Sequence, residues 1–179
     1  MVEFLRMFEV LCEGRHLRFV RRNGWEFVER KNITGIAIVI AVTDDRKVLI
    51  LDQYREPLAG RVLELPAGLA GDEGAQESCE EAANRELIEE TGYRAARLEV
   101  LSEGPPSPGL SDERVTIYLA RGLSKVGAGG GIGEEDIRVH EVPLNDAFDW
   151  LEERRAEGRL VDPKVFAGLA LAGRRMRAL

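Results

Sequence analysis

Short runs of alternating hydrophobic and polar residues fill the first third of the chain. Three of them, FEVLCEG, HLRFVRR and GWEFVER, are separated by Glu-Gly and Asn-Gly turns, a pattern typical of a meander of hairpins. The next run, TGIAIVIAV at 34–42, is apolar on both faces and predicts a buried strand. Two further extended segments follow, KVLILDQYR and RVLELPAGL, and the second ends at Pro66 and Gly68. The chain therefore begins as a β structure.

Helical patterns begin in the middle of the chain and alternate with further strands. Gly92 follows the first of them and has the position of a residue that ends a helix. Three helices are expected, at about Glu77 to Thr91, at 144–156 and at 163–177. The remaining strands are expected near 96–101, 115–120 and 137–142.

The order of these elements indicates an α+β fold, with a mixed β-sheet between helices and an N-terminal antiparallel strand region. We divide the chain into this strand region at 1–33 and a main domain at 34–179. The strand region has little apparent core of its own, so we expect it to dock elsewhere. The segment GAGGGIG at 127–133 is of low complexity and predicts a mobile loop.

The charge and the cysteines exclude several classes of protein. A net charge of −7 argues against a nucleic-acid backbone as the main partner. Cys12 and Cys79 lie far apart without a CxxC pattern, which indicates a reducing compartment and no zinc ribbon. Charged residues interrupt the opening MVEFLRMFEVLCEG, and the longest apolar run, 33–42, is too short to span a bilayer. We therefore expect a cytoplasmic protein that binds neither nucleic acid nor a membrane.

The first predicted helix carries glutamates within its apolar surface. At about 100° per residue, its apolar stripe would hold Cys79, Ala82, Ala83 and Leu87. Glu86 and Glu90 fall inside this stripe, where two carboxylates repel each other unless a cation lies between them. Arg85 is four residues from both Glu81 and Glu89, a spacing that predicts ion pairs to both. A solvated face with ion pairs is the alternative, but oxygen ligands at i and i+4 suit Mg²⁺ or Mn²⁺, and their placement favours a metal site.

The segment GDEGAQESCEEAANRELIEETGY at 71–93 resembles the Nudix box, Gly-x5-Glu-x7-Arg-Glu-U-x-Glu-Glu-x-Gly-U, in which U is a bulky apolar residue. The matching residues are Gly71, Glu77, Arg85, Glu86, Leu87, Glu89, Glu90, Gly92 and, with an aromatic in place of the common aliphatic, Tyr93. The order of strands and helices around the box is also similar to the Nudix fold. The resemblance makes 34–179 a Nudix hydrolase domain.

This resemblance implies a metal-dependent hydrolase of nucleoside diphosphates linked to another moiety. It makes Glu86, Glu90 and the Ala67 carbonyl metal ligands, with Mg²⁺ as the expected ion and Mn²⁺ or Zn²⁺ as alternatives. It also assigns Glu89 and Arg85 to the catalytic machinery. Glu89 would assist the metal ligands, and Arg85 together with Glu77 would brace the loop–helix–loop unit.

Segments outside the box are similar to the ADP-ribose pyrophosphatase subfamily: SPGLSDE at 107–113, GWEFVER, QYREP and LELPAGL. The likeness places Trp25 over an adenine ring, Arg30 near a phosphate and Arg55 in a second anion-binding position. It adds Glu113 to the substrate-binding residues. Hairpin packing is the alternative for Trp25, and an ordinary surface position is the alternative for the two arginines.

In this subfamily the catalytic base comes from a loop between the later strands, which here is GAGGGIGEEDIRVH. Glu135 matches the loop glutamate best, and Glu134 lies next to it. The preceding glycines would allow a lid to close over the substrate. The alternative is that these acidic residues only solvate the end of a loop.

The resemblance favours ADP-ribose as the substrate, cleaved to AMP and a sugar phosphate, with FAD or another ADP-linked sugar as alternatives. A nucleotide-binding Nudix module without turnover is a further alternative, which the intact box disfavours. A Ca²⁺-binding structural protein is disfavoured because the chain has no EF-hand loop. The subfamily exchanges its N-terminal strands between subunits, so the resemblance implies a homodimer in which Trp25 and Arg30 serve the partner's site.

Overall fold

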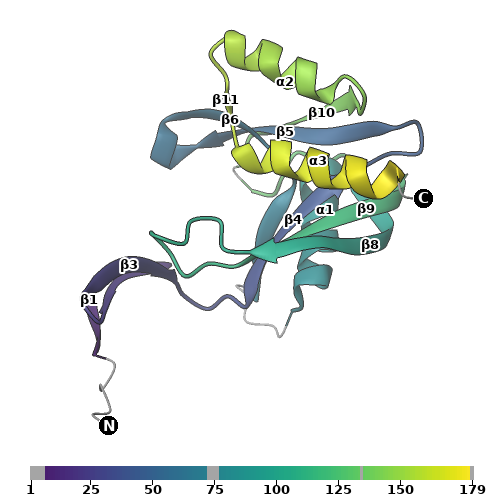
Figure 1. The fold of residues 1–179 in the computed structure, drawn as a ribbon. Helices are drawn as coiled ribbons and strands as arrows, with labels where there is room; N and C mark the ends of the chain where they lie inside the picture. Colours follow the sequence, from purple (N-terminus) through teal and green to yellow (C-terminus); the bar gives the residue numbers. More distant parts are fainter. Residues whose placement is uncertain (1–6, 72–76, 134, 178–179) are drawn as a thin grey trace.

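The structure is a computed structural model that describes residues 7–71, 77–133 and 135–177. Its elements, shown in Figure 1, run along the chain as β1 (Phe8–Glu13), β2 (Leu17–Arg22), β3 (Trp25–Arg30), β4 (Gly35–Ala41), β5 (Lys47–Arg55), the 3₁₀ turn η1 (Glu56–Leu58), β6 (Gly60–Glu64), β7 (Ala67–Ala70), α1 (Cys79–Thr91), β8 (Tyr93–Gly104), β9 (Val115–Lys125), β10 (Ile137–Pro143), α2 (Ala147–Ala156), β11 (Leu160–Val161) and α3 (Pro163–Arg177).

These strands form three sheets. The first contains β1, β2 and β3, and the other two have the orders β7-β4-β9-β8 and β10-β5-β6-β11. In the body of the molecule β4 pairs in parallel with β9, and β6 with β11, whereas the other pairs are antiparallel. The α+β fold with mixed sheets is thereby confirmed, and the body contains two such sheets rather than one. The segment RVLELPAGL is divided between them, as β6 and β7.

β4 joins the two halves of the apolar core. Ile38 and Ile40 belong to the cluster that includes residues of α2 and α3, whereas Ala37 and Val39 belong to the cluster that includes residues of α1. All four side chains are at most 2% exposed. Burying a branched side chain of this size contributes about 1.5–3 kcal/mol. The run that is apolar on both faces is therefore the buried strand that its pattern predicts.

α1 begins two residues later than the sequence pattern suggests, because Ser78 caps it. The Ser78 hydroxyl accepts a hydrogen bond from the Glu81 N–H, and the Glu81 carboxylate accepts one from the Ser78 N–H at 2.9 Å, which completes a capping box. Since the cap engages Glu81, the expected ion pair between Glu81 and Arg85 was wrong. At the other end Gly92 has a φ of 77°, in the left-handed region, and ends the helix as predicted.

The N-terminal sheet stands apart from the body in Figure 1. It meets the body at the connection between β8 and β9, where the Val28 N–H donates to the Leu110 carbonyl at 2.8 Å and Val28 forms a parallel bridge with Ser111. Large apolar side chains remain exposed on this sheet: Phe8, Val10, Leu17, Phe19 and Trp25. The strand register places Phe8, Val10 and Trp25 on one face and Leu17 and Phe19 on the other, so apolar side chains are exposed on both faces of this sheet.

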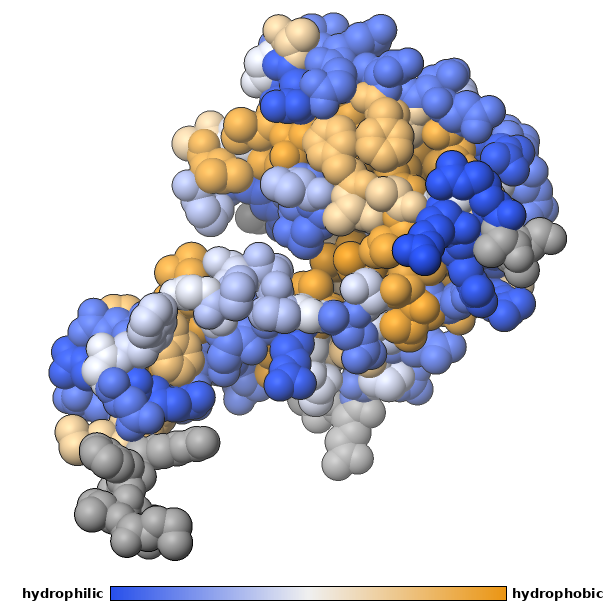
Figure 2. Space-filling model, viewed as in Figure 1, coloured by the Kyte–Doolittle hydropathy of each residue, from blue (hydrophilic) through white to orange (hydrophobic). Residues whose placement is uncertain are grey.

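Figure 2 shows further apolar side chains gathered in the body around α2 and α3. The rings of Phe148 and Phe166 lie 6.1 Å apart there, and Phe148 borders a surface hollow of about 650 Å³ together with Leu144 and Leu169. Among the described residues, no helix combines the length and the apolar character that crossing a bilayer requires.

Candidate active site

Glu90 is the most deeply buried acid of α1, with 4% of the residue exposed. Its Oε2 accepts a hydrogen bond from the Ala67 N–H at 3.0 Å, which ties α1 to the start of β7. Burial is the main cause that raises the pKa of Glu90 to about 8, and the charges of Glu86 and Glu135 act in the same direction. The Ala67 hydrogen bond and the charge of Arg55 oppose the rise. At neutral pH this carboxylate needs a further positive partner to stay ionised.

Glu86 lies one turn before Glu90 and is partly buried. Burial raises its pKa to about 7, while Arg85, whose Nη1 donates to Glu86 Oε1 at 2.7 Å, acts to lower it. The side chain packs directly on Gly68, where an added Cβ would lie only 1.9 Å from Glu86 Cδ. The PAG segment therefore requires glycine at this position because any side chain would displace the carboxylate.

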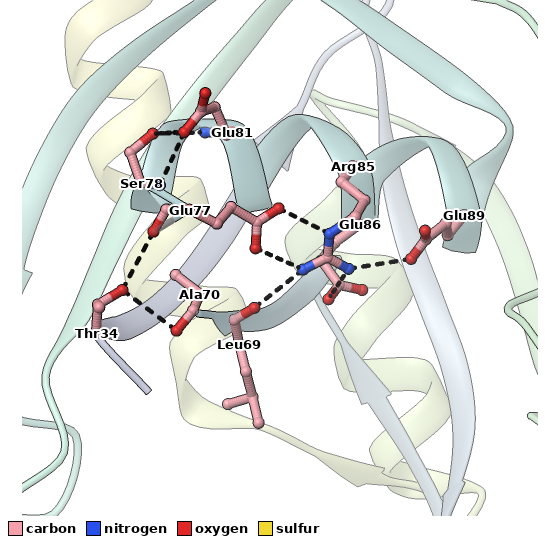
Figure 3. A network of polar contacts seen from close by, with 9 residues as sticks. All are labelled: Thr34, Leu69, Ala70, Glu77, Ser78, Glu81, Arg85, Glu86 and Glu89. Atoms are coloured by element: carbon pink, nitrogen blue, oxygen red, sulfur yellow. Dashed lines mark hydrogen bonds and ion pairs between the residues drawn. The ribbon is translucent and has the colours of Figure 1, made fainter. Parts of the chain in front are cut away.

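Arg85 is the hub of the contacts drawn in Figure 3. Its Nε and Nη2 donate to the two carboxylate oxygens of Glu77 at 2.9 and 3.0 Å, and Nη2 also donates to the Leu69 carbonyl at 3.0 Å. Its Nη1 donates to Glu89 Oε2 at 3.2 Å as well as to Glu86. The bonds to Glu77 and, after them, to Glu86 raise the pKa of Arg85 well above its ordinary value. Arg85 thus ties β7, the entry to α1 and two acids of α1 into one unit, and its predicted pair with Glu89 is confirmed.

Arg55 supplies positive charge from the end of β5. It lies close enough to Glu90 for its charge to oppose the rise in the pKa of that carboxyl group. Its Nε donates to Glu64 Oε1 on β6 at 2.9 Å. The sequence interpretation missed Glu64, although an acid within the apolar segment VLELP was a signal that could have identified it.

Gln53 is a second residue that sequence reasoning missed. It is 7% exposed, and its Oε1 has no hydrogen-bond partner among the described residues. Because side chains alternate along a strand, Gln53 faces the same side of β5 as Leu49, which packs in the α1 cluster, and Arg55. A buried acceptor without a partner is a feature that calls for a ligand, an ion or a water molecule.

The glycine-rich segment 127–133 was expected to be a mobile loop, but the structure docks it on the C-terminal end of α1. The backbone N–H groups of Gly130 and Gly131 donate to carbonyls of the last turn of that helix. The segment leads to Glu135, whose charge acts to raise the pKa of the Glu86 and Glu90 carboxyl groups. Glu134, the other candidate base, lies outside the described residues.

The remaining predicted residues lie near the N-terminal sheet rather than at α1. Trp25, on β3, is 64% exposed. It borders a hollow of about 280 Å³ with Arg22, Phe27, Pro108, Ser111 and Asp112. Arg30 donates from Nε to Glu113 Oε1 at 2.8 Å, so these two residues pair with each other. The predicted site is thus divided within one chain, and only its acidic half, with Arg55 and Arg85, is assembled around α1.

The chemistry of this acidic half fits a divalent cation. Glu86 and Glu90 offer carboxylate oxygens whose pKa values are raised by burial, and a cation would hold both groups ionised. Gln53 adds a buried oxygen on the side of β5 that also carries Arg55. The two carboxylates are directed to Arg85 and Ala67 in the structure, and its described residues contain no group of three His, Cys, Asp or Glu side chains arranged to hold a metal.

Comparison with known proteins identifies the family. The NUDIX domain model matches residues 33–164. The chain belongs to the Nudix family. It is 40% identical over 121 residues to the ADP-ribose pyrophosphatase of Bacillus subtilis (strain 168), and 38% identical over 122 residues to the methanol dehydrogenase activator of Bacillus methanolicus. These alignments cover 67% and 68% of this chain and 64% of each relative, so the chain spans less than two thirds of their length.

A solved structure shows that the Nudix fold extends over nearly the whole chain. The crystal structure of an ADP compounds hydrolase superposes with a TM-score of 0.74, at 23% identity, and covers 96% of this chain and 92% of that one. In this Nudix domain the box residues 79–91 form the capped helix α1, which Arg85 and Glu90 connect to β7.

Proposed function

We propose that this Nudix protein is a divalent-metal-dependent pyrophosphohydrolase that cleaves ADP-ribose, or a related nucleoside diphosphate sugar, to AMP and a sugar phosphate. The observation that carries the proposal is the pair Glu86 and Glu90, one turn apart on the box helix, with pKa values raised to about 7 and about 8. An acidic pair of this kind is suited to hold a cation between the protein and an anionic substrate. The similarity to an ADP-ribose pyrophosphatase supports the same activity.

Glu86, Glu90 and the Ala67 carbonyl would hold the ion, for which Mg²⁺ is the first choice and Mn²⁺ or Zn²⁺ are alternatives. A bound divalent ion would neutralise phosphate oxygens and lower the pKa of a water molecule beside them. Arg85 would keep Glu86 in position, and Arg55 would add positive charge from the end of β5. The acidic protein could then accept an acidic substrate.

In the reaction a water oxygen forms a bond to one phosphorus atom of the pyrophosphate as the bridging P–O bond breaks. Glu135 would accept the proton that this water loses, because its charge already acts on both metal-binding carboxyls. Glu89, paired with Arg85 at 3.2 Å, would assist on the helix side. The products are the two phosphate monoesters.

A homodimer would complete the site. Trp25 and Arg30 lie on the N-terminal sheet, which stands apart from α1 and exposes apolar side chains. Contact with a second copy would cover exposed apolar side chains of this sheet. It would also bring Trp25, Arg30 and Glu113 close to the α1 carboxylates of the partner subunit, where the exposed indole can stack on an adenine ring.

Turnover of a substrate panel tests the proposal. Purified protein is given ADP-ribose, FAD or a GDP-linked sugar with Mg²⁺ or with EDTA, and nucleotide products are identified by chromatography. We expect AMP from ADP-ribose with Mg²⁺ and none with EDTA. Binding of ADP-ribose without AMP release would refute hydrolysis in favour of a nucleotide-binding module, and AMP release that EDTA leaves unchanged would refute the metal site.

A further inference from the structure

The segment before Glu135 is fixed to α1 through its backbone. The Gly130 N–H donates to the Glu90 carbonyl at 2.8 Å, and the Gly131 N–H donates to the Glu89 carbonyl at 3.0 Å. At Gly129, where φ is 72°, an added Cβ would lie 2.4 Å from the carbonyl carbon of Thr91. Only glycine permits this close approach of two backbones. One end of the segment is thus attached to Glu89 and Glu90, whose side chains take part in the proposed hydrolysis.

The segment after Glu135 is fixed to the sheet through Arg61 of β6. Arg61 Nη1 pairs with the carboxylate of Asp136, and Nη2 donates to the Asp136 backbone carbonyl at 3.2 Å. Arg61 Nε donates to Asp52 Oδ1 at 2.8 Å, and Asp52 Oδ2 lies 3.7 Å from Arg159. The side chains of Arg61 and Asp52 are only 14% and 5% exposed. Separating a buried ion pair leaves each charge without a partner, which is costly, so Arg61 and Asp52 should keep their geometry.

Glu135 itself folds back on the segment between these two attachments. Its N–H donates to the Ile132 carbonyl at 3.2 Å, and its Oε2 accepts from the Ile132 N–H at 2.9 Å. At Gly131 φ is 88° and an added Cβ would lie 2.7 Å from Glu135 Cβ, so glycine is required for this turn as well. Glu135 therefore lies between a segment attached to α1 by backbone hydrogen bonds and Asp136, which the Arg61 side chain holds.

We propose that residues 129–133 and 136 form a fixed support for Glu135, here called the Glu135 bracket, and that Arg61 is a positioning residue that acts on Glu135 through Asp136. The inference rests on the proposed function, in which Glu135 accepts the proton. Misplacing a catalytic group by about 1 Å can lower the rate about 10²-fold. A side chain on β6, on the other side of the sheet from α1, would thus set the rate without touching the substrate.

The variant Asp136→Ala tests the role of the bracket, because the Asp136 side chain is 62% exposed and its loss leaves the core intact. We expect kcat for ADP-ribose to fall about 10- to 100-fold, with KM unchanged within about twofold. Arg61→Lys keeps the charge but loses the forked geometry, and it should lower kcat in the same way. Asp149→Ala, at an exposed aspartate of α2, is the matched control and should leave both constants unchanged.

A double variant separates positioning from general damage. In a Glu135→Gln protein there is no base to position, so adding Asp136→Ala should lower kcat no further. A full, multiplicative loss in the double variant would overturn the inference, as would a normal kcat for Asp136→Ala when Glu135→Gln is impaired.

Hydrogen exchange gives a readout that does not depend on activity. The amides of Gly130 and Gly131 should exchange as slowly as those of the last turn of α1, and Asp136→Ala should speed exchange at the end of the segment. Exchange of Gly130 and Gly131 in the wild type at the rate of a free coil would overturn the bracket. If instead the proposed hydrolysis is wrong and the bracket is right, the Gly130 and Gly131 amides will be protected in a protein that releases no AMP.

Discussion

Replacing Glu90 with glutamine separates metal binding from folding. Glutamine keeps the size of the side chain and an oxygen for the Ala67 N–H, which Glu90 contacts at 3.0 Å, but it removes the negative charge. Loss of a metal ligand at this position would remove several kcal/mol of transition-state stabilisation. A loss of about 4 kcal/mol corresponds to a kcat about 10³-fold lower. We therefore expect Glu90→Gln to be nearly inactive at saturating Mg²⁺ while it remains folded.

In the metal-free protein the same substitution should be stabilising at alkaline pH. Burial raises the pKa of Glu90 from its ordinary value of 4.5 to about 8. The stability that this group contributes is fully present below pH 4.5 and is lost as the pH rises through 8, because the unfolded chain gives up the proton first. At about 1.4 kcal/mol per pKa unit, the loss is at most about 5 kcal/mol. Glutamine does not titrate, so it avoids this loss.

Thermal unfolding in EDTA and in Mg²⁺, at pH 5 and pH 8, measures both effects beside kcat. In EDTA at pH 8 the variant should unfold at a higher temperature than the wild type, and the difference should shrink at pH 5. Mg²⁺ at 100 times its Kd should stabilise the wild type by about 2.7 kcal/mol and the variant much less. Glu80→Gln, at an exposed glutamate of the same helix, is the control. A Glu90→Gln protein that keeps its activity and its Mg²⁺ stabilisation would show that Glu90 is not a ligand.

Three further predictions concern other parts of the molecule. Gly68→Ala places a Cβ 1.9 Å from Glu86 Cδ, so kcat should fall at least about tenfold with the fold retained, and a normal kcat would contradict the close packing seen here. Ser78→Ala removes the helix cap and should lower the free energy of unfolding by about 1 kcal/mol at unchanged kcat, measured by denaturant titration. Phe19→Glu, at an exposed position of the N-terminal sheet, should convert a dimer to a monomer in light scattering. The monomer should lose the contribution of Trp25 to substrate binding in the partner's site, and a monomer mass for the wild type would refute the proposed dimer.

Local patterns in the sequence were sufficient for those parts of the fold that depend on neighbouring residues. The double-faced apolar run of β4, the glycine that ends α1 and the placement of Glu90 in an apolar stripe all follow from spacing along the chain, and each agrees with the structure. The Nudix box identified the family because its spacing is fixed. The family model then confirmed the family, and the solved structure confirmed the fold.

Features that depend on distant residues were not accessible in this way. Helix spacing suggested Glu81 as the partner of Arg85, but Arg85 pairs with Glu77, which precedes α1 and which only the box resemblance had indicated. The division of RVLELPAGL between two sheets depends on partners that lie elsewhere in the chain. Arg61 gave no signal as a site residue, since its contact with Asp136 spans 75 positions. Side-chain pairs of this kind require the three-dimensional register of the strands.

The parallel pairing of β4 with β9 has a consequence for how the chain reaches its native state. Ile38 lies opposite Ile117, so the two strands can meet only after the long intervening segment is brought together. Each strand of the N-terminal sheet, in contrast, pairs with its neighbour in sequence. Because pairing between distant segments slows folding, the hairpins should form well before the body closes. Refolding should therefore show an early β-rich species with exposed apolar side chains, which aggregates more as the protein concentration rises.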